Sequence, residues 1–260
     1  MTNEHNGNVV RLSGIRHACG DCSLFELCLP VSLGKPDVDL LDEIVQRRRP
    51  LAKGDHLYRS ADPFRSIYAV RAGALKTVTI SEDGEEQVTG FHLPGEMLGF
   101  DAINHGAHPC SAIALETTSV CEIPFENLEE LATKIPGLQH TLLRIMSKEI
   151  FQDQEMLHAV AKRTAEERLA IVLLSFSERY ANRGLSASRF RLPMSRSDLS
   201  NYLGLAPETM SRLFKRFQEQ GLLRSDGKEI ILESVEGLRD MAHQSAPKGR
   251  FSRQGGNSWA

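Results

Sequence analysis

The sequence predicts an α+β chain in which a compact β-barrel or jelly roll precedes a long helix and a C-terminal helix-turn-helix. Three observations support this prediction. Short β-rich runs separated by turn residues occupy the stretch between Pro50 and Pro124. Residues 138–164 contain neither Gly nor Pro and repeat apolar residues at helical spacing. The segment from Leu192 to Leu223 places two short amphipathic helices on either side of a glycine turn.

Composition limits the class of protein. The chain has 260 residues, 41% hydrophobic and 25% charged, which suits two modest globular domains. No apolar stretch reaches the length of a membrane span, and the first residues lack the basic start and apolar core of a signal peptide. We therefore expect a cytoplasmic protein with no membrane partner. We find no nucleophile elbow, phosphate-binding loop or catalytic metal motif, so we do not expect an enzyme.

The barrel prediction depends on five short runs rich in β-branched and aromatic residues. Gly73, Gly84 and Gly95 supply turn signals between several of them. The runs are IYAV (67–70), LKTVTI (75–80), QVTGFHL (87–93), SAIALE (111–116) and SVCEI (119–123). An amphipathic helix is predicted before them over Asp37–Arg49, and another after the long helix over Ala165–Tyr180.

The long helix carries an apolar row whose members follow one another by steps of three and four, as in a coiled-coil seam. A second stripe of Leu142, Ile145 and Met156 would face the barrel of the same chain. The alternative is a single buried helix, but two apolar faces favour a helix that also binds a second copy. The predicted dimerisation residues are Leu143, Met146, Ile150, Asp153, Leu157 and Val160.

Asp153 interrupts this apolar row. In a parallel dimer it would lie close to its own symmetry mate, and two like charges in a partly desolvated seam oppose association. We therefore expect Asp153 to keep the dimer marginal, so that another event shifts a monomer–dimer equilibrium. The alternative is a side chain that turns to solvent and has little effect.

The C-terminal segment has the signals of a helix-turn-helix. Ser195 is a predicted N-cap with Asp198 in the first turn, and Gly204 supplies the turn between the helices. Pro207 suits the first position of the second helix, which we expect to end at Gly221. The residues after it are typical of a small β wing.

Three side chains near the start of the second helix share one face. Glu208, Ser211 and Arg212 stand at positions i, i+3 and i+4, and these residue types suit contacts with base edges in a major groove. The alternative is a solvated Glu–Arg ion pair. Neighbouring basic residues suit contacts with phosphates: they are Arg189, Arg191, Arg196, Lys215 and Arg216.

Three of the five cysteines lie in one short run, CGDCSLFELC, which contains Cys19, Cys22 and Cys28. An odd number of cysteines in a reducing compartment disfavours structural disulfides. Metal binding or redox chemistry is therefore favoured, although no fourth cysteine lies nearby in the sequence.

These motifs together resemble the Crp/Fnr family of bacterial regulators, and within it the oxygen-responsive Fnr/Anr branch. The resemblance extends from Cys19 to about Leu238 through CGDCSLFELCLP, EEQVTGFHLPGEMLGFDAI, ALETTSVCEIPFENL, TAEERLA, FRLPMSRSDLSNYLGL and ETMSRLFKRFQ. It implies a cyclic-nucleotide-binding-like β-roll, a dimerisation helix and a winged helix-turn-helix. The implied divisions are a cysteine segment (1–30), a sensor domain (31–135), a dimerisation helix (136–164), a DNA-binding domain (165–245) and a disordered tail (246–260).

The resemblance also implies a fourth ligand, Cys121 in SVCEIPFE, and a 4Fe-4S cluster held by Cys19, Cys22, Cys28 and Cys121. An oxygen-labile cluster would promote dimerisation and binding to a double-stranded DNA site resembling TTGAT-N4-ATCAA. Alternatives are a response to nitric oxide or thiol redox state, or a structural zinc site with the same cysteines.

Two further partner expectations follow from the resemblance. The acidic turn Ser81–Glu85 resembles barrel surfaces that contact RNA polymerase in the family, the alternative being a solvated turn with no partner. Cyclic nucleotide binding is not expected, because Cys110-Ser111 replaces the Arg-Ser pair that holds the phosphate in cyclic-AMP-binding relatives.

Overall fold

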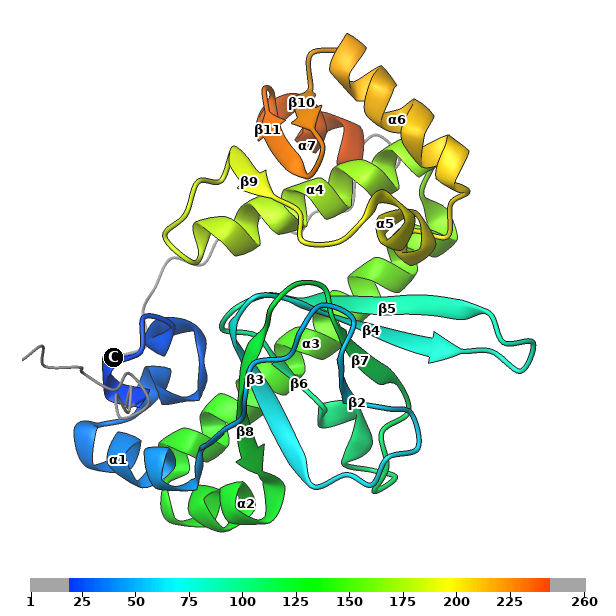
Figure 1. Ribbon diagram of the computed structural model, residues 1–260. Coiled ribbons are helices and arrows are strands. Elements are labelled where there is room, and N and C mark those ends of the chain that lie inside the picture. The colour runs from blue at the N-terminus through cyan, green and yellow to red at the C-terminus, as the bar shows by residue number, and fades with distance from the viewer. Residues whose placement is uncertain (1–18, 244–260) are drawn as a thin grey trace, which may run out of the picture.

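Two four-stranded antiparallel sheets pack face to face between residues 46 and 124 (Figure 1). The computed structural model describes residues 19–243. One sheet has the order β1 (Gln46–Arg47), β8 (Ser119–Pro124), β3 (Ser66–Ala72) and β6 (Met97–Leu98). The other has the order β2 (His56–Tyr58), β7 (Ser111–Ala114), β4 (Leu75–Ile80) and β5 (Glu86–His92). Val70 and Leu75 are among the inner side chains that form their common core. The predicted jelly roll is confirmed.

The five predicted β runs all form strands. Strands β1, β2 and β6 were not predicted, because each has only two or three residues, too few to show an alternation of apolar and polar side chains. The helix predicted over Asp37–Arg49 is shorter than expected. It is α1 (Lys35–Ile44), and the chain extends at Val45 so that Gln46–Arg47 pairs with β8. Backbone pairing with the sheet therefore overrides the helical pattern at this end.

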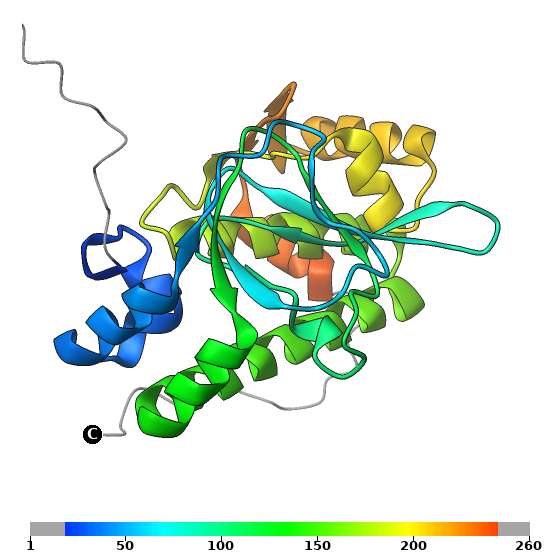
Figure 2. The same ribbon diagram turned by 60° about the horizontal axis from the view of Figure 1, so that its bottom comes forward.

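Helices cover one side of the barrel. Figure 2 shows α2 (Phe125–Lys134) and α3 (Pro136–Lys162) along its underside. The N-terminal residues 19–32 form three short 3-10 turns, η2 (Cys19–Asp21), η3 (Phe25–Leu27) and η4 (Leu29–Ser32), beside α1. We call residues 19–33 the cysteine coil. Its apolar residues share a core with α1, α2 and α3.

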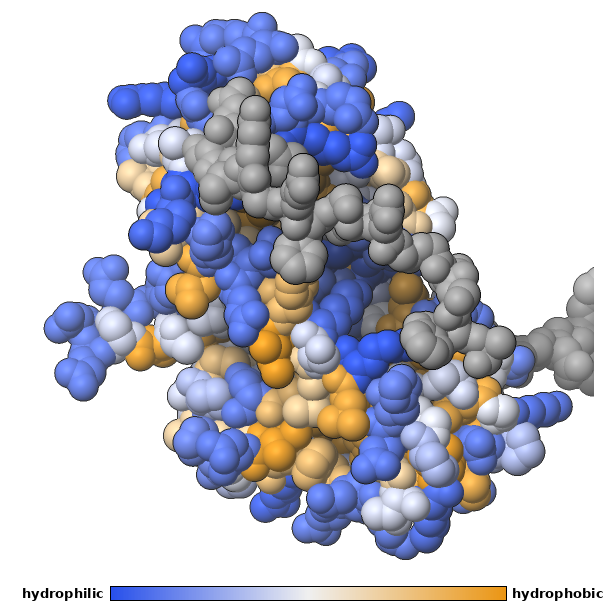
Figure 3. Space-filling view, turned by 180° about the vertical axis from the view of Figure 1, so that it is seen from behind, coloured by the Kyte–Doolittle hydropathy of each residue, from blue (hydrophilic) through white to orange (hydrophobic). Residues whose placement is uncertain are grey.

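The two apolar faces of α3 have different surroundings. Leu142 and Ile145 pack against the core below the barrel and Met156 against the core above it, so the second stripe faces its own chain as predicted. The seam row points outward: Leu143 is 60% exposed, Ile150 57% and Leu157 71%. Hydrophobic side chains gather on the face of the molecule shown in Figure 3.

The C-terminal domain contains α4 (Ala165–Ala181), α5 (Arg196–Tyr202), α6 (Pro207–Glu219) and α7 (Val235–His243). Its small sheet has the order β10 (Leu223–Asp226), β11 (Glu229–Leu232) and β9 (Arg189–Arg191). Ser195 and Asp198 form a reciprocal capping box at the start of α5, Pro207 occupies the first turn of α6, and Gly204 adopts a φ of 62° in the turn. The helix-turn-helix and wing are confirmed, while β9 and α7 were not predicted.

The barrel and the C-terminal domain share a continuous apolar core, which includes Val88 and Phe91 from β5 and Leu199 from α5. Polar contacts also connect the barrel to the C-terminal domain. The Lys76 ammonium donates to the Asp198 carboxylate at 2.8 Å, and the backbone N–H of Val88 donates to Asn201 Oδ1 at 2.6 Å.

No helix within residues 19–243 is long and apolar enough to cross a membrane. The predicted tail, 246–260, lies outside the described residues, as do residues 1–18.

Candidate functional site

The cysteine coil is a series of short turns that brings its thiols toward the barrel. The N–H of Cys22 donates to the carbonyl of Cys19 at 3.2 Å, and the N–H of Phe25 donates to Cys22 at 3.0 Å. The N–H of Cys28 donates to Phe25 at 3.4 Å. Such turns advance the chain only a few ångströms at a time, so residues 19–28 stay compact.

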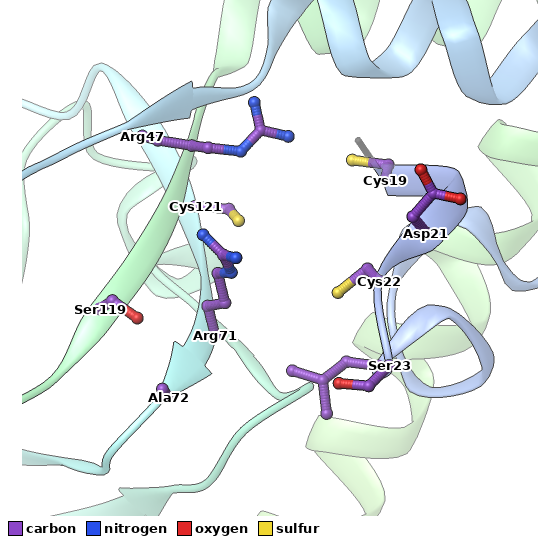
Figure 4. Close-up of a pocket in the computed structure, with 10 residues that line it drawn as sticks. Cys19, Asp21, Cys22, Ser23, Arg47, Arg71, Ala72, Ser119 and Cys121 are labelled. Carbon is purple, nitrogen blue, oxygen red and sulfur yellow. The ribbon is translucent and has the colours of Figure 1, made fainter. Parts of the chain in front are cut away.

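One cavity lies between this coil and the first sheet. It has a volume of about 470 Å³ and is lined by Cys19 and Cys22 from the coil and by Cys121 from β8. Figure 4 shows the coil cysteines on one side and Cys121 on the other. Three of the four cysteines named from the sequence therefore line one space, although Cys121 is about a hundred residues away along the chain.

Cys28 does not line the cavity but packs against the apolar core at its base, together with Cys19 and Cys121. Burial raises the pKa of its thiol to about 12, and the negative charges that Cys121 and Cys22 would carry add to this rise. The four thiols are thus close enough to influence one another.

The protein alone favours thiolates at neither Cys19 nor Cys121, as at Cys28. Burial, followed by the Asp42 carboxylate, raises the pKa of Cys19 well above its usual range. Burial also raises the pKa of Cys121, and the guanidinium groups of Arg47 and Arg71 oppose that rise. A bound metal group would supply the missing positive charge, because metals bind the deprotonated thiol.

The donor set around the cavity consists mainly of cysteine thiols. No three His, Cys, Asp or Glu side chains among residues 19–243 converge closely enough to share a single metal ion. Three of the four thiols line one cavity, and cysteine thiolates are the usual ligands of iron–sulfur clusters, which contain several metal ions. The residues present therefore fit a cluster.

Cys110 belongs to a different environment. It is 4% exposed in the core between the two sheets, and its thiol donates to the Asp101 carboxylate at 3.3 Å. The neighbouring Ser111 hydroxyl accepts the N–H of Ser60 at 2.9 Å. Burial, then Asp101, raises the pKa of the Cys110 thiol to about 12, so this position presents a neutral thiol.

The side chains predicted to read bases are on one outward face of α6. Glu208, Ser211 and Arg212 are all exposed, while Met210 and Leu213 on the opposite face are buried. The Ser211 hydroxyl donates back to the Pro207 carbonyl at 3.0 Å. Figure 1 shows α6 along the outer edge of the molecule.

The basic residues predicted to contact phosphates differ in their surroundings. Arg196 stacks on the ring of Phe214, with 3.2 Å between guanidinium carbon and ring centroid, and burial lowers its pKa to about 10. Arg191 pairs with Glu116 at 2.7 Å, and Arg216 pairs with Glu166. Lys215 is exposed, 3.8 Å from Glu219.

Comparisons with known proteins agree with this architecture. Residues 48–135 match a cyclic nucleotide-binding domain and residues 167–241 a Crp-like helix-turn-helix domain. Transcriptional activator protein anr of Pseudomonas aeruginosa is 56% identical over 219 residues, 84% of this chain and 90% of that protein. The chain belongs to the Crp/Fnr family. The fumarate and nitrate reduction regulatory protein of Escherichia coli K12 is 47% identical over 233 residues, 90% of this chain and 93% of that protein.

Structural similarity leads to the same family. FixK2 from Bradyrhizobium japonicum superimposes with a TM-score of 0.70 at 29% identity, covering 76% of this chain and 97% of FixK2. The Crp-like helix-turn-helix makes this Crp/Fnr protein a DNA-binding regulator of transcription. Its named relatives are transcriptional regulators rather than enzymes.

Three residues that line the cavity or contact its lining were not found from the sequence: Arg47, Arg71 and Asp42. The Asp42 carboxylate accepts the N–H of Cys19 at 3.0 Å and pairs with Arg47 at 2.6 Å. Arg47 and Arg71 come from strands on either side of β8. No spacing rule connects them with the cysteines, because the sheet order rather than the sequence brings them together.

Proposed function

We propose that this protein is an oxygen-responsive transcriptional activator in which Cys19, Cys22, Cys28 and Cys121 hold a 4Fe-4S cluster. The observation that carries the proposal is the cavity in which two coil cysteines face Cys121 of β8. The cluster, when bound, supplies an oxygen-sensitive link between these two distant segments. The named activators among the relatives support the transcriptional role.

Direct contacts support a route from the coil to the dimerisation helix. Leu29 and Leu33 of the coil share an apolar core with Leu138 of α3. The Ser32 hydroxyl donates to the Gly137 carbonyl at 3.4 Å and contacts the Thr141 hydroxyl. Fixing the coil against the barrel therefore fixes the inner face of α3, and the outer face of the same helix carries the seam.

The exposed seam supports a homodimer, which is the usual state of the family. Leu143, Ile150 and Leu157 are apolar side chains that water covers in the single chain. Asp153, which is exposed, lies between the last two, and partial desolvation of its carboxylate, followed by the charge of Asp101, raises its pKa. A seam of this composition holds two copies together weakly, so a ligand that favours the dimeric arrangement shifts the equilibrium.

The dimer would read a two-fold DNA site resembling TTGAT-N4-ATCAA. Each α6 helix presents Glu208, Ser211 and Arg212, and Arg212 is suited to guanine O6 and N7. The turn Ser81–Glu85, at the tip of the β4–β5 hairpin, is the surface we propose for RNA polymerase, and cytoplasmic location follows from this role.

Anaerobic purification, followed by visible absorption and iron and sulfide analysis, tests the proposal. We expect a broad absorption in the blue region, about four irons per chain, and bleaching when air is admitted. Colourless protein that contains zinc would make the cysteines structural. Colourless protein without metal would contradict the cluster and favour thiol redox sensing. A cluster that resists air and bleaches with nitric oxide would identify nitric oxide as the signal.

A further inference from the structure

The barrel wall of the cavity carries two positive charges beside Cys121. Arg47 on β1 is the direct cross-strand partner of Cys121. Arg71 belongs to β3, the strand on the other side of β8, in which Ala69 pairs with Cys121. Both guanidinium groups line the cavity and flank the Cys121 thiol in Figure 4.

These two arginines have different partners. Arg47 pairs with Asp42 at 2.6 Å, and the same carboxylate accepts the N–H of Cys19, so Arg47 helps to position the coil. The guanidinium of Arg71 makes neither a hydrogen bond nor an ion pair with any of residues 19–243. It is half-buried at the cavity wall, where a cation without an anion is costly.

A negatively charged group in the cavity would balance the positive charges of Arg47 and Arg71. Two guanidinium groups and three thiols line the same space, and the cavity carries one acidic side chain, Asp21, on its coil side. The sulfur atoms of a thiolate-bound cluster are weak acceptors with net negative charge, and nearby charge is one of the factors that set cluster potentials.

We infer that Arg71, assisted by Arg47, is a positioning residue that compensates the negative charge of the cluster and slows its reaction with oxygen. This inference rests on the proposed function. Positive charge at this wall stabilises the electron-rich form of the group against loss of an electron, and it holds the thiolates of the coil and of β8 together.

The test compares Arg71→Gln with Arg71→Lys, which keeps the charge, and with Arg59→Gln, which removes an exposed charge after β2, outside the cavity lining. Each protein is purified anaerobically and assayed for iron and sulfide before and after gel filtration. The bleaching rate at one fixed oxygen concentration and the midpoint potential are then measured.

We expect Arg71→Gln to bleach roughly three- to ten-fold faster than wild type, the order expected for one nearby charge under partial solvent screening. Its potential should fall and its iron content should drop on gel filtration, while Arg71→Lys and Arg59→Gln stay near wild type. Equal bleaching rates and potentials in wild type and Arg71→Gln would overturn the inference. Wild-type protein without iron would instead contradict the proposed function, so the two failures are distinguishable.

Discussion

Glu96 joins the barrel to the C-terminal domain, and removing its charge should destabilise the protein by about 3 kcal/mol. The Arg179 Nε donates to one Glu96 oxygen at 2.8 Å, and Arg183 donates to the same oxygen at 2.7 Å. The side chains of Glu96, Arg179 and Arg183 are only 26%, 17% and 7% exposed. Substituting Glu96 with Gln leaves two partly buried cations facing a neutral amide.

The size of the effect follows from two lines of reasoning. Breaking a buried ion pair by removing one partner costs about 3–5 kcal/mol, and partial exposure places this pair at the lower end. The pKa of Glu96 gives the second line of reasoning. Burial alone would raise this pKa, but the guanidinium groups of Arg179 and Arg183 outweigh burial and lower it from 4.5 to about 2. A shift of that size corresponds to about 3 kcal/mol of stability.

Urea unfolding followed by far-ultraviolet circular dichroism at pH 7.5 measures the effect. We expect Glu96→Gln to lower the unfolding midpoint by roughly 1 M. The matched control is Glu116→Gln, which breaks another ion pair between the barrel and the C-terminal domain, with Arg191. The side chains of Arg191 and Glu116 are 51% and 36% exposed, so the loss of this ion pair should lower the free energy of unfolding by less than about 1 kcal/mol. Equal small shifts in both variants would show that burial does not set the strength of these two ion pairs.

Three further predictions concern acid stability, association and DNA reading. Because the pKa of Glu96 is depressed in the folded state, the stability that its carboxylate contributes is present above pH 4.5 and is lost as pH falls toward 2. The unfolding free energy of Glu96→Gln should therefore depend less on pH in that range than that of wild type. Parallel curves of unfolding free energy against pH for the two proteins would contradict this. Substituting Asp153 with Ala removes like charges from the seam and should tighten the dimer roughly ten-fold, as measured by sedimentation; no change would mean that the carboxylate turns to solvent. Substituting Arg212 with Ala should cost about 1–3 kcal/mol in binding and relax base preference at its contact; wild-type protein that binds a guanine-substituted site equally well would refute the assignment.

The sequence was sufficient to predict those elements whose local signals agree with their tertiary surroundings. The capping residues Ser195 and Asp198 and the turn residue Gly204 each impose a local geometry, and the structure has that geometry. The inner stripe of α3 is periodic and packs against its own chain as predicted, and Leu143, Ile150 and Leu157 of the outer row are exposed; their role in a dimer stays a prediction.

What could not be predicted depends on contacts between distant segments. Arg47 looked like the end of a helix, but it belongs to a strand because β8 offers it a backbone partner. The cysteine coil has no apolar period, so its 3-10 turns gave no signal. Cys121 was associated with the coil only through the family resemblance, and Arg71 was not associated with it at all, because the sheet order alone brings them to one cavity.

The proposed cluster links the coil to β8 through Cys121, so iron and sulfide analysis of two cysteine variants is the decisive measurement. Cys121→Ser and Cys110→Ser each remove one thiol from the barrel, but only Cys121 lines the cavity. Under anaerobic purification, we predict about four irons per chain in Cys110→Ser, as in wild type, and almost none in Cys121→Ser. Full iron content in Cys121→Ser, or its loss in Cys110→Ser alone, would show that Cys121 does not hold the cluster.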